Sequence, residues 1–268
     1  MEKIYLIMFF IFGSVFSSFL CVIGYRLPQK ISFITGRSRC DNCGHELKFY
    51  ELIPVLSYII QGGKCRKCSC QIPAIIPICE IIGGFLFSFA YYLFGFSYNL
   101  LFAILIASLF LIVLVTDVNY YIIPDEVIIF FAIAFVITQY FSGGIKNVGV
   151  HLLTGAMLFS LMYLTMLLGE KIFKKESLGG GDVKLLFLFG LVLEPIMGIV
   201  TIFLASMIAL PISFLILIKS KSNMIPFGPF LNLAFLILFY TQLTTDQLIR
   251  ILTWKISYIF LFFSLNLL

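Results

Sequence analysis

The chain has 268 residues, of which 61% are hydrophobic and only 12% are charged, and its mean hydropathy is +1.10. This composition excludes an ordinary soluble domain, and the lack of alternating apolar segments argues against an outer-membrane barrel. The net charge of +5 is modest, so we use it to orient helices and infer no nucleic-acid partner. We expect an all-α integral membrane protein, a polytopic helical bundle in a lipid bilayer.

The first predicted elements are a membrane span within residues 1–24 and a polar block, residues 25–72. The apolar run from about Ile4 to Gly24 has no small-residue cleavage site after it, so we expect it to be retained. The polar block contains eight lysines and arginines. Such a density of positive charge is typical of the cytoplasmic side, which predicts that the N-terminus lies outside.

Residues 73–268 are predicted to form the membrane-embedded core. A crossing needs about 20 apolar residues, and the long run from Val183 to Ile218 divides naturally at Glu194-Pro195, because proline disfavours helix in the residue before it. Nine crossings fit the charge pattern in total, and eight remain an alternative. The remaining predicted spans are at about Pro73–Phe96, Asn99–Thr116, Asp125–Phe141, Val148–Gly169, after residues 225–230, and at Ile249–Leu267.

Two aspartates are placed together by this topology. Asp117 ends the third span and Asp182 begins the sixth, so both are expected at the same depth on the cytoplasmic face. Each alone is explained as well by a helix-end position as by function, but carboxylates in a membrane are costly and the pair favours function. Two neighbouring carboxyl groups share one proton, so one can activate water while the other protonates a carbonyl oxygen. The pattern predicts aspartyl-protease chemistry.

Three glycines, Gly179, Gly180 and Gly181, precede Asp182 and would let backbone approach substrate closely. The segment LGGGDVKLLFLFG (178–190) contains a GxGD motif and resembles the type IV prepilin peptidases, which are membrane aspartyl proteases. Further segments between residues 17 and 231 also resemble this family, namely SSFLCVIGYRLP (17–28), LIPVLSYIIQGGKCRKC (52–68), IPICE (76–80), TDVNYYIIPDE (116–126) and IPFGPFL (225–231).

The resemblance implies that Asp117 and Asp182 are the catalytic dyad. It also implies a bacterial inner-membrane enzyme that cuts prepilins or pseudopilins on the cytoplasmic side, after the glycine that ends a short basic leader. Many members of the family then methylate the new N-terminus with S-adenosylmethionine, although this chain shows no methyltransferase signature of its own. Where the family usually has Asn, this chain has Cys21.

Four cysteines form two CxxC pairs in the polar block, Cys40 with Cys43 and Cys65 with Cys68. Paired thiolates at this spacing predict a structural zinc site, and four sulfur ligands leave no open position for catalysis. Cys70 and His45 are near enough to be alternative ligands, whereas Cys21 and Cys79 are interpreted as buried apolar residues. The resemblance places this zinc-binding cytoplasmic module over the membrane site, where Asp41, Glu46 and Glu51 either meet the leader or are solvated.

Three other charged residues are candidates for support of the site. Asp125 follows Pro124 and fits a helix N-terminal residue or a second group near the dyad. Glu80 lies within the second span and is expected to face the interior with a partner. Lys184 is two residues past Asp182 and either biases the dyad or extends to the interface.

Two other function classes fit part of the pattern. A presenilin or signal-peptide-peptidase type of GxGD protease would have Tyr before the first aspartate, where this chain has Thr116, and Pro-Ala-Leu where it has PFGPF. A transporter with a carboxylate proton relay would distribute its carboxylates through the bilayer depth, whereas these gather at one face. The sequence carries no signal for an oligomeric state.

Overall fold

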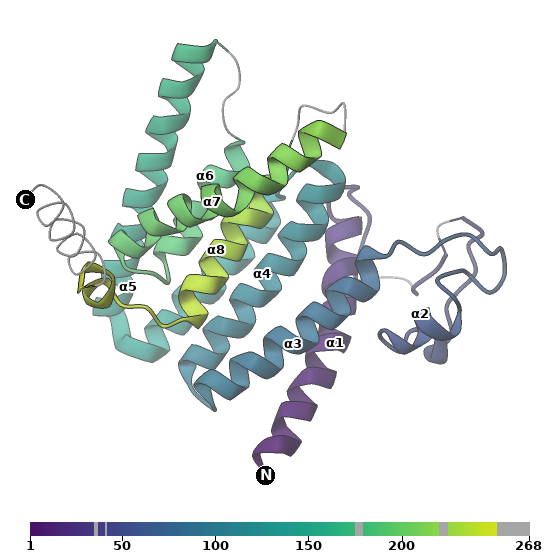
Figure 1. Ribbon diagram of the computed structural model, residues 1–268. Coiled ribbons are helices and arrows are strands. Elements are labelled where there is room, and N and C mark those ends of the chain that lie inside the picture. Colours follow the sequence, from purple (N-terminus) through teal and green to yellow (C-terminus); the bar gives the residue numbers. More distant parts are fainter. Residues whose placement is uncertain (35–36, 41, 175–178, 220–224, 251–268) are drawn as a thin grey trace, which may run out of the picture.

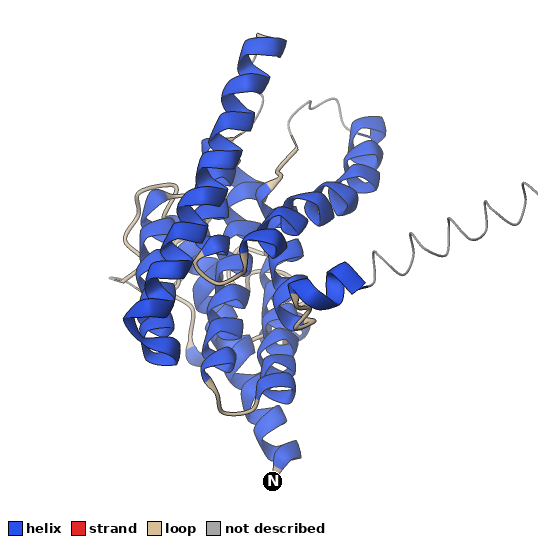
Figure 2. Cartoon of the chain, turned by 90° about the vertical axis from the view of Figure 1, so that its left-hand side faces the viewer, coloured by secondary structure: helices blue, strands red, loops and turns tan. Residues whose placement is uncertain are grey.

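A computed structural model describes residues 1–34, 37–40, 42–174, 179–219 and 225–250. This part of the chain is helical, with no named strand, as Figure 2 shows. The all-α prediction is thereby confirmed. The elements are α1 (Glu2–Arg26), η1 (Phe49–Glu51), α2 (Leu56–Ile60), α3 (Ile75–Phe94), α4 (Tyr98–Tyr120), α5 (Asp125–Phe173), α6 (Gly180–Gly190), α7 (Pro195–Lys219) and α8 (Gly228–Tyr240).

Helix α4 lies at the centre of the bundle and packs against α1, α3, α5 and α8 (Figure 1). It begins where the Ser97 Oγ accepts a hydrogen bond from the Leu100 backbone N–H, 3.3 Å away. Residues Leu109, Leu111 and Val113 are completely buried, and most of the rest of the helix is buried with them. A helix that is apolar on every side and surrounded by others holds its polar end group, Asp117, in a fixed place.

Five of the described helices, α1, α3, α4, α5 and α7, are long and apolar enough to cross a membrane. The first three agree with the first three predicted spans to within a few residues. Helix α5 combines the predicted fourth and fifth spans, with a break at Gly144, whose φ of 73° suits glycine. The Gln139 Oε1 accepts a 2.6 Å hydrogen bond from Asn147 Nδ2, which satisfies polar groups beside the break.

The predicted division near Pro195 agrees with the structure, since α6 ends at Gly190 and α7 begins at Pro195. Helices α6 and α8 have 11 and 13 residues, which is shorter than the roughly 20 that cross a bilayer. Most of the last predicted span, Ile249–Leu267, lies outside the described residues. The count of eight or nine crossings therefore stays a prediction.

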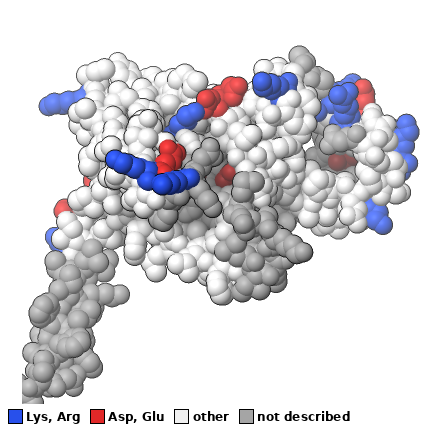
Figure 3. All heavy atoms as spheres, turned by 90° about the horizontal axis from the view of Figure 1, so that it is seen from above, with Lys and Arg blue, Asp and Glu red and all other residues white. Residues whose placement is uncertain are grey.

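The polar block forms a separate small module between α1 and α3. Figure 1 and the view from above in Figure 3 both place it to one side of the bundle. This position differs from the expectation that it lies over the membrane site. The physical reason is that both of its connections, at Arg26 and Ile75, lead to α1 and α3, which pack together at the edge of the bundle.

Candidate active site

Three helix ends meet around Asp117. This residue is in the last turn of α4, and the C-cap residue that follows the helix, Tyr121, has the left-handed conformation (φ 56°). Its side chain is buried, and its Oδ2 accepts a hydrogen bond from the backbone N–H of Gly228, 3.0 Å away. Gly228 is the first residue of α8, so this N–H has no partner within its own helix. The carboxyl of Asp117 thus caps the N-terminus of α8.

Asp182 reaches the same place from α6. It is the third residue of that helix and is also buried. Its carboxyl turns back over the helix start, because a Cβ added at Gly179 would lie 3.3 Å from Asp182 Oδ2. Gly181, the residue before Asp182, and Gly228, which binds Asp117, both lie against the Ile123 side chain, since a Cβ added at either would stand 3.1 Å from it. The structure therefore brings the two predicted aspartates together, as the charge-based topology required.

Glycines around the dyad differ in what they allow. A Cβ at Gly228 would stand 2.9 Å from Asp117 Oδ2, and a Cβ at Gly181 would stand 3.1 Å from the Ile123 side chain. Gly180, in contrast, has open space at its Cβ position. Gly179 has φ −68° and the next two glycines are helical, so none of the three needs an unusual backbone conformation. Close approach explains Gly179 and Gly181 but not Gly180. Gly228 and Ile123 had been given no role from the sequence.

Two helix N-termini therefore face the dyad. The first turn of α6 carries Asp182 itself, and the first N–H of α8 points at Asp117. Helix N-termini carry partial positive charge, so both arrangements stabilise negative charge on the carboxyl groups. This offsets part of the cost of burying a carboxylate near apolar side chains. The arrangement can hold one carboxylate and one carboxylic acid side by side.

Lys184 forms an ion pair with Asp125, and their Nζ and Oδ1 atoms are 2.5 Å apart. Asp125 is the first residue of α5, as expected for a helix N-terminal acid. Both side chains are largely exposed, so the pair contributes at most about 1 kcal/mol. It joins the start of α5 to the start of α6 beside the dyad.

Glu80 is buried in α3 and has a partner, as predicted for an acidic residue within a span. Its Oε2 accepts a 2.7 Å hydrogen bond from the backbone N–H of Val55, which lies in the module. The Ser14 Oγ of α1 donates to the Glu80 carbonyl oxygen, 3.0 Å away. Glu80 thereby connects the module to α1 and α3.

The four predicted metal ligands lie together. The sulfur atoms of Cys40, Cys43, Cys65 and Cys68 are all within 4.8 Å of one another. Tetrahedral zinc with Zn–S bonds of about 2.3 Å places its ligand sulfurs about 3.8 Å apart. The Cys40–Cys68 and Cys43–Cys65 sulfur distances are 3.7 and 4.0 Å. The donor set fits zinc. Cys70 is a near neighbour, with its sulfur 3.4 Å from that of Cys40.

The two CxxC pairs form similar turns. In each, the first cysteine N–H donates to the carbonyl five residues later, from Cys40 to His45 and from Cys65 to Cys70. The backbone N–H of Cys70, together with its thiol, lowers the pKa of Cys68 to about 6. Backbone N–H groups, Cys43 first, also lower the pKa of Cys40. Cys40 and Cys68 are thus the two clustered cysteines that are favoured as thiolates, which is the form that binds metal.

Glu51 holds the two turns together. It is buried and accepts a 2.8 Å hydrogen bond from the backbone N–H of Lys48. Its carboxylate also lies 3.4 Å from His45 Nε2 and 3.9 Å from Arg66 Nε. The prediction of a solvated or leader-binding Glu51 was wrong, because the turn at η1 points this side chain inward between the two cysteine pairs. His45 faces Glu51, which explains why it is not among the clustered ligands.

Comparison with known proteins identifies the family of this chain. Residues 11–94 match the bacterial peptidase A24 N-terminal domain, and residues 103–214 match the type IV leader peptidase family. The prepilin leader peptidase/N-methyltransferase of Bacillus subtilis is 35% identical over 184 residues, which cover 69% of this chain and 72% of that protein. This chain belongs to the type IV leader peptidase family.

Other members of the type IV leader peptidase family match as well. The prepilin leader peptidase/N-methyltransferase of Vibrio cholerae is 28% identical over 255 residues, covering 90% of this chain and 98% of that protein. The protein of the same name from Myxococcus xanthus is 31% identical over 187 residues, covering 70% of this chain and 56% of that protein. No solved structure gives a significant match.

Proposed function

We propose that this chain is a membrane aspartyl endopeptidase that removes the short basic leader of type IV prepilins or pseudopilins after a glycine, with Asp117 and Asp182 as its catalytic dyad. The observation that carries the proposal is the meeting of these two buried carboxyl groups at three helix ends. Membership of the family and the names of its relatives support the substrate class.

The chemistry follows from two neighbouring carboxyl groups that share one proton. The ionised carboxylate takes a proton from water, whose oxygen attacks the scissile carbonyl carbon while the carboxylic acid protonates the carbonyl oxygen. The tetrahedral intermediate then collapses: the second carboxylate takes a proton from one of its hydroxyl groups, the C–N bond breaks, and the leaving amine receives a proton from the first carboxyl, which restores the dyad with one shared proton. The N-termini of α6 and α8 stabilise the negative charge that remains on the dyad throughout.

The position of the dyad suits a substrate that leaves the membrane. Figure 3 views the molecule from the side at which α4 ends and α6 and α8 begin, and charged side chains gather on this face. Positive charge of this kind favours the cytoplasmic side, so we assign the active site to the cytoplasmic face of the bacterial inner membrane. A prepilin would place its apolar helix in the bilayer and its leader in the cytoplasm.

Replacement of either aspartate tests the proposal. In cells that co-express a host prepilin, Asp117→Asn and Asp182→Asn should each abolish leader removal, because neither can complete the proton transfers. Lys184→Met is the matched control, since its partner is the exposed Asp125 and processing should continue. Full processing by either Asn variant would refute the catalytic assignment.

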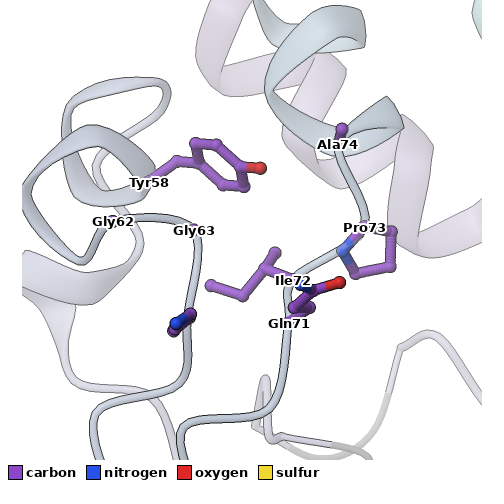
Figure 4. Close-up of a pocket in the computed structure, with 8 residues that line it drawn as sticks. Tyr58, Gly62, Gly63, Gln71, Ile72, Pro73 and Ala74 are labelled. Atoms are coloured by element: carbon purple, nitrogen blue, oxygen red, sulfur yellow. The ribbon is translucent and has the colours of Figure 1, made fainter.

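The second activity, N-methylation, needs a place for S-adenosylmethionine, whose sulfonium supplies the methyl group. A cavity of about 500 Å³ lies between α2 and the start of α3. Figure 4 shows Tyr58 and Ile72 on either side of its opening. The aromatic ring offers a stacking surface for adenine, and Lys64 offers a charge for the carboxylate of the ligand. On the basis of this ring and this charge, we propose the cavity as the binding site for S-adenosylmethionine.

Binding and methylation can be measured separately. Tyr58→Leu and Lys64→Ala should each weaken S-adenosylmethionine binding to the purified protein by about tenfold or more in calorimetry, while leader cleavage continues. Mass spectrometry of the mature pilin should then find an unmodified amine. Unchanged binding in both variants would exclude this cavity as the site.

We assign a structural zinc ion to the four clustered cysteines. Four thiolates complete a tetrahedral shell, so the ion would hold the two turns together and take no part in hydrolysis. Purified protein should contain close to one zinc per chain, and replacement of both Cys40 and Cys43 by Ser should remove it. Zinc at the wild-type level in that variant would refute the assignment.

A further inference from the structure

The module exposes an unusual run of apolar side chains. Residues 49–60, here named the apolar segment, comprise η1, α2 and the residues between them. Phe49 is 86% exposed, Ile59 66% and Ile60 72%. Tyr50, Leu52, Ile53 and Leu56 are also more than a third exposed. In an aqueous module, a group of this size marks an interaction surface.

The structure also indicates the depth of the apolar segment. Glu80 lies five residues past the start of α3, which is about 7.5 Å along a helix. Its carboxylate holds the backbone N–H of Val55, the residue before α2, at 2.7 Å. In Figure 1, α2 lies to the side of the bundle, lower in the view than the start of α3. The apolar face of an interfacial helix lies about 5–10 Å into the boundary between headgroups and acyl chains. The start of α2 is held within the first two turns of α3, a helix that is long and apolar enough to cross the membrane.

The Val55 backbone is strained by this connection. Its φ of 62° is a conformation that a β-branched residue rarely adopts. The bond to the buried Glu80 holds it there, so the start of α2 is fixed against the membrane-spanning helices. A mobile loop would not maintain that conformation.

The surroundings of the apolar segment are basic. Exposed Lys48, Lys64 and Lys67 flank it in the sequence, and the Arg66 guanidinium lies 5.0 Å from the centre of the Tyr50 ring. Basic side chains next to an apolar face favour an anionic lipid surface. The same charges would repel a substrate that enters with a basic leader, so lipid suits this surface better than the prepilin does.

We propose that the apolar segment is an interfacial membrane anchor, in which Phe49, Leu56, Ile59 and Ile60 enter the lipid of the leaflet that adjoins the module. The anchor lies in the plane of the membrane surface and does not cross it. It fixes the cysteine turns at the bilayer, beside the bundle. Its existence does not depend on the assignment of the catalytic or the S-adenosylmethionine site.

Tryptophan fluorescence in lipid nanodiscs tests the anchor in the full-length, zinc-loaded protein. The single tryptophan, Trp254, is first replaced by Phe, and Ile60→Trp is then added. Lipids brominated on their acyl chains should quench the new tryptophan at least about threefold more than they quench Lys67→Trp, the matched control beside the cysteines. Ile59→Trp provides a second reporter if Ile60→Trp fails to retain zinc.

Two results would overturn the proposal. The first is equal quenching at positions 60 and 67, which would place the segment in water. The second is weak quenching by lipid that changes to a blue-shifted, protected tryptophan only when a prepilin is added, which would make the segment a substrate surface. Strong quenching in anionic nanodiscs without prepilin supports the anchor.

Discussion

At the scale of the residue, the contact between Gly228 and Asp117 fixes one half of the dyad. A methyl group at Gly228 would stand 2.9 Å from Asp117 Oδ2 and would displace the carboxyl from the backbone N–H that binds it. We predict that Gly228→Ala lowers the initial rate of prepilin cleavage by about a hundredfold, because loss of one positioned donor has effects of this size.

Two glycines provide controls for this prediction. Gly180→Ala adds a methyl group in open space, so its cleavage rate should stay within about twofold of wild type. Gly155→Ala crowds the Phe187 carbonyl at 2.9 Å but touches neither aspartate, so it should lower stability more than rate. Equal rates for the Gly228 and Gly155 variants would contradict the role of Gly228.

Ser69 offers a stabilising change. It has φ 58° in the second cysteine turn, where the first turn has Gly44 with φ 68°. A left-handed conformation costs a non-glycine residue about 1 kcal/mol, so Ser69→Gly should stabilise the folded module by roughly that amount. Hydrogen exchange of the module amides measures the change. The reverse replacement, Gly44→Ser, should destabilise it, and a change of the same sign in both would refute the explanation.

The sequence was informative about side chains and less so about backbone partners. The pairing of Asp117 and Asp182 was predictable, because positive charge orients spans and the two aspartates end spans on the same side. The hydrogen-bond partner of Asp117 was not predictable, because it is a backbone N–H 111 residues away and every residue except proline has such a group. Glu51 was misjudged because its burial depends on how two cysteine turns pack against each other.

At the scale of the element, the module depends on the charge of Glu51. The backbone N–H of Lys48, His45 and Arg66 lower the pKa of Glu51 below its usual value. A carboxyl whose folded pKa is lowered stabilises the fold above its unfolded pKa of about 4.3, and this contribution is lost as pH falls through the lower folded pKa.

Glu51→Gln should therefore destabilise the module at pH 7, and the difference from wild type should shrink below about pH 4. Acid releases zinc from both proteins. The difference between their free energies of unfolding in urea, taken at the same pH, therefore reports the effect of Glu51. A difference that grows on acidification, or none at pH 7, would show that the charge of Glu51 is not what stabilises the two turns.

Helix boundaries illustrate which elements were predictable. Proline marked the division between α6 and α7 because it constrains its neighbour whatever the tertiary structure. The loop expected at residues 142–147 is instead a break within α5, where Gly144 turns the chain and Gln139 binds the Leu191 carbonyl, 2.9 Å away. That bond comes from packing between helices, which hydrophobicity along one segment does not encode.

At the scale of the whole molecule, the buried helix α4 positions Asp117. The short helices α6 and α8 position Asp182 and the backbone N–H of Gly228 beside it. Helix α4 is surrounded by others, so Asp117 keeps its position, while α6 and α8 both begin beside it. Family membership was predictable from several motifs between residues 17 and 231. The lateral position of the module was not, because it follows from the packing of α1 and α3.

The central claim is that Asp117 and Asp182 act as one catalytic unit. Purified protein in liposomes, with a prepilin in the same membrane, allows the cleavage rates of Asp117→Asn, Asp182→Asn and the double variant to be compared. The effects of replacing two groups that act together are not additive. We therefore predict that each single variant loses as much activity as the double variant, at equal zinc content. A single variant that retains a tenth of the wild-type rate, or a double variant far below both singles, would contradict the account.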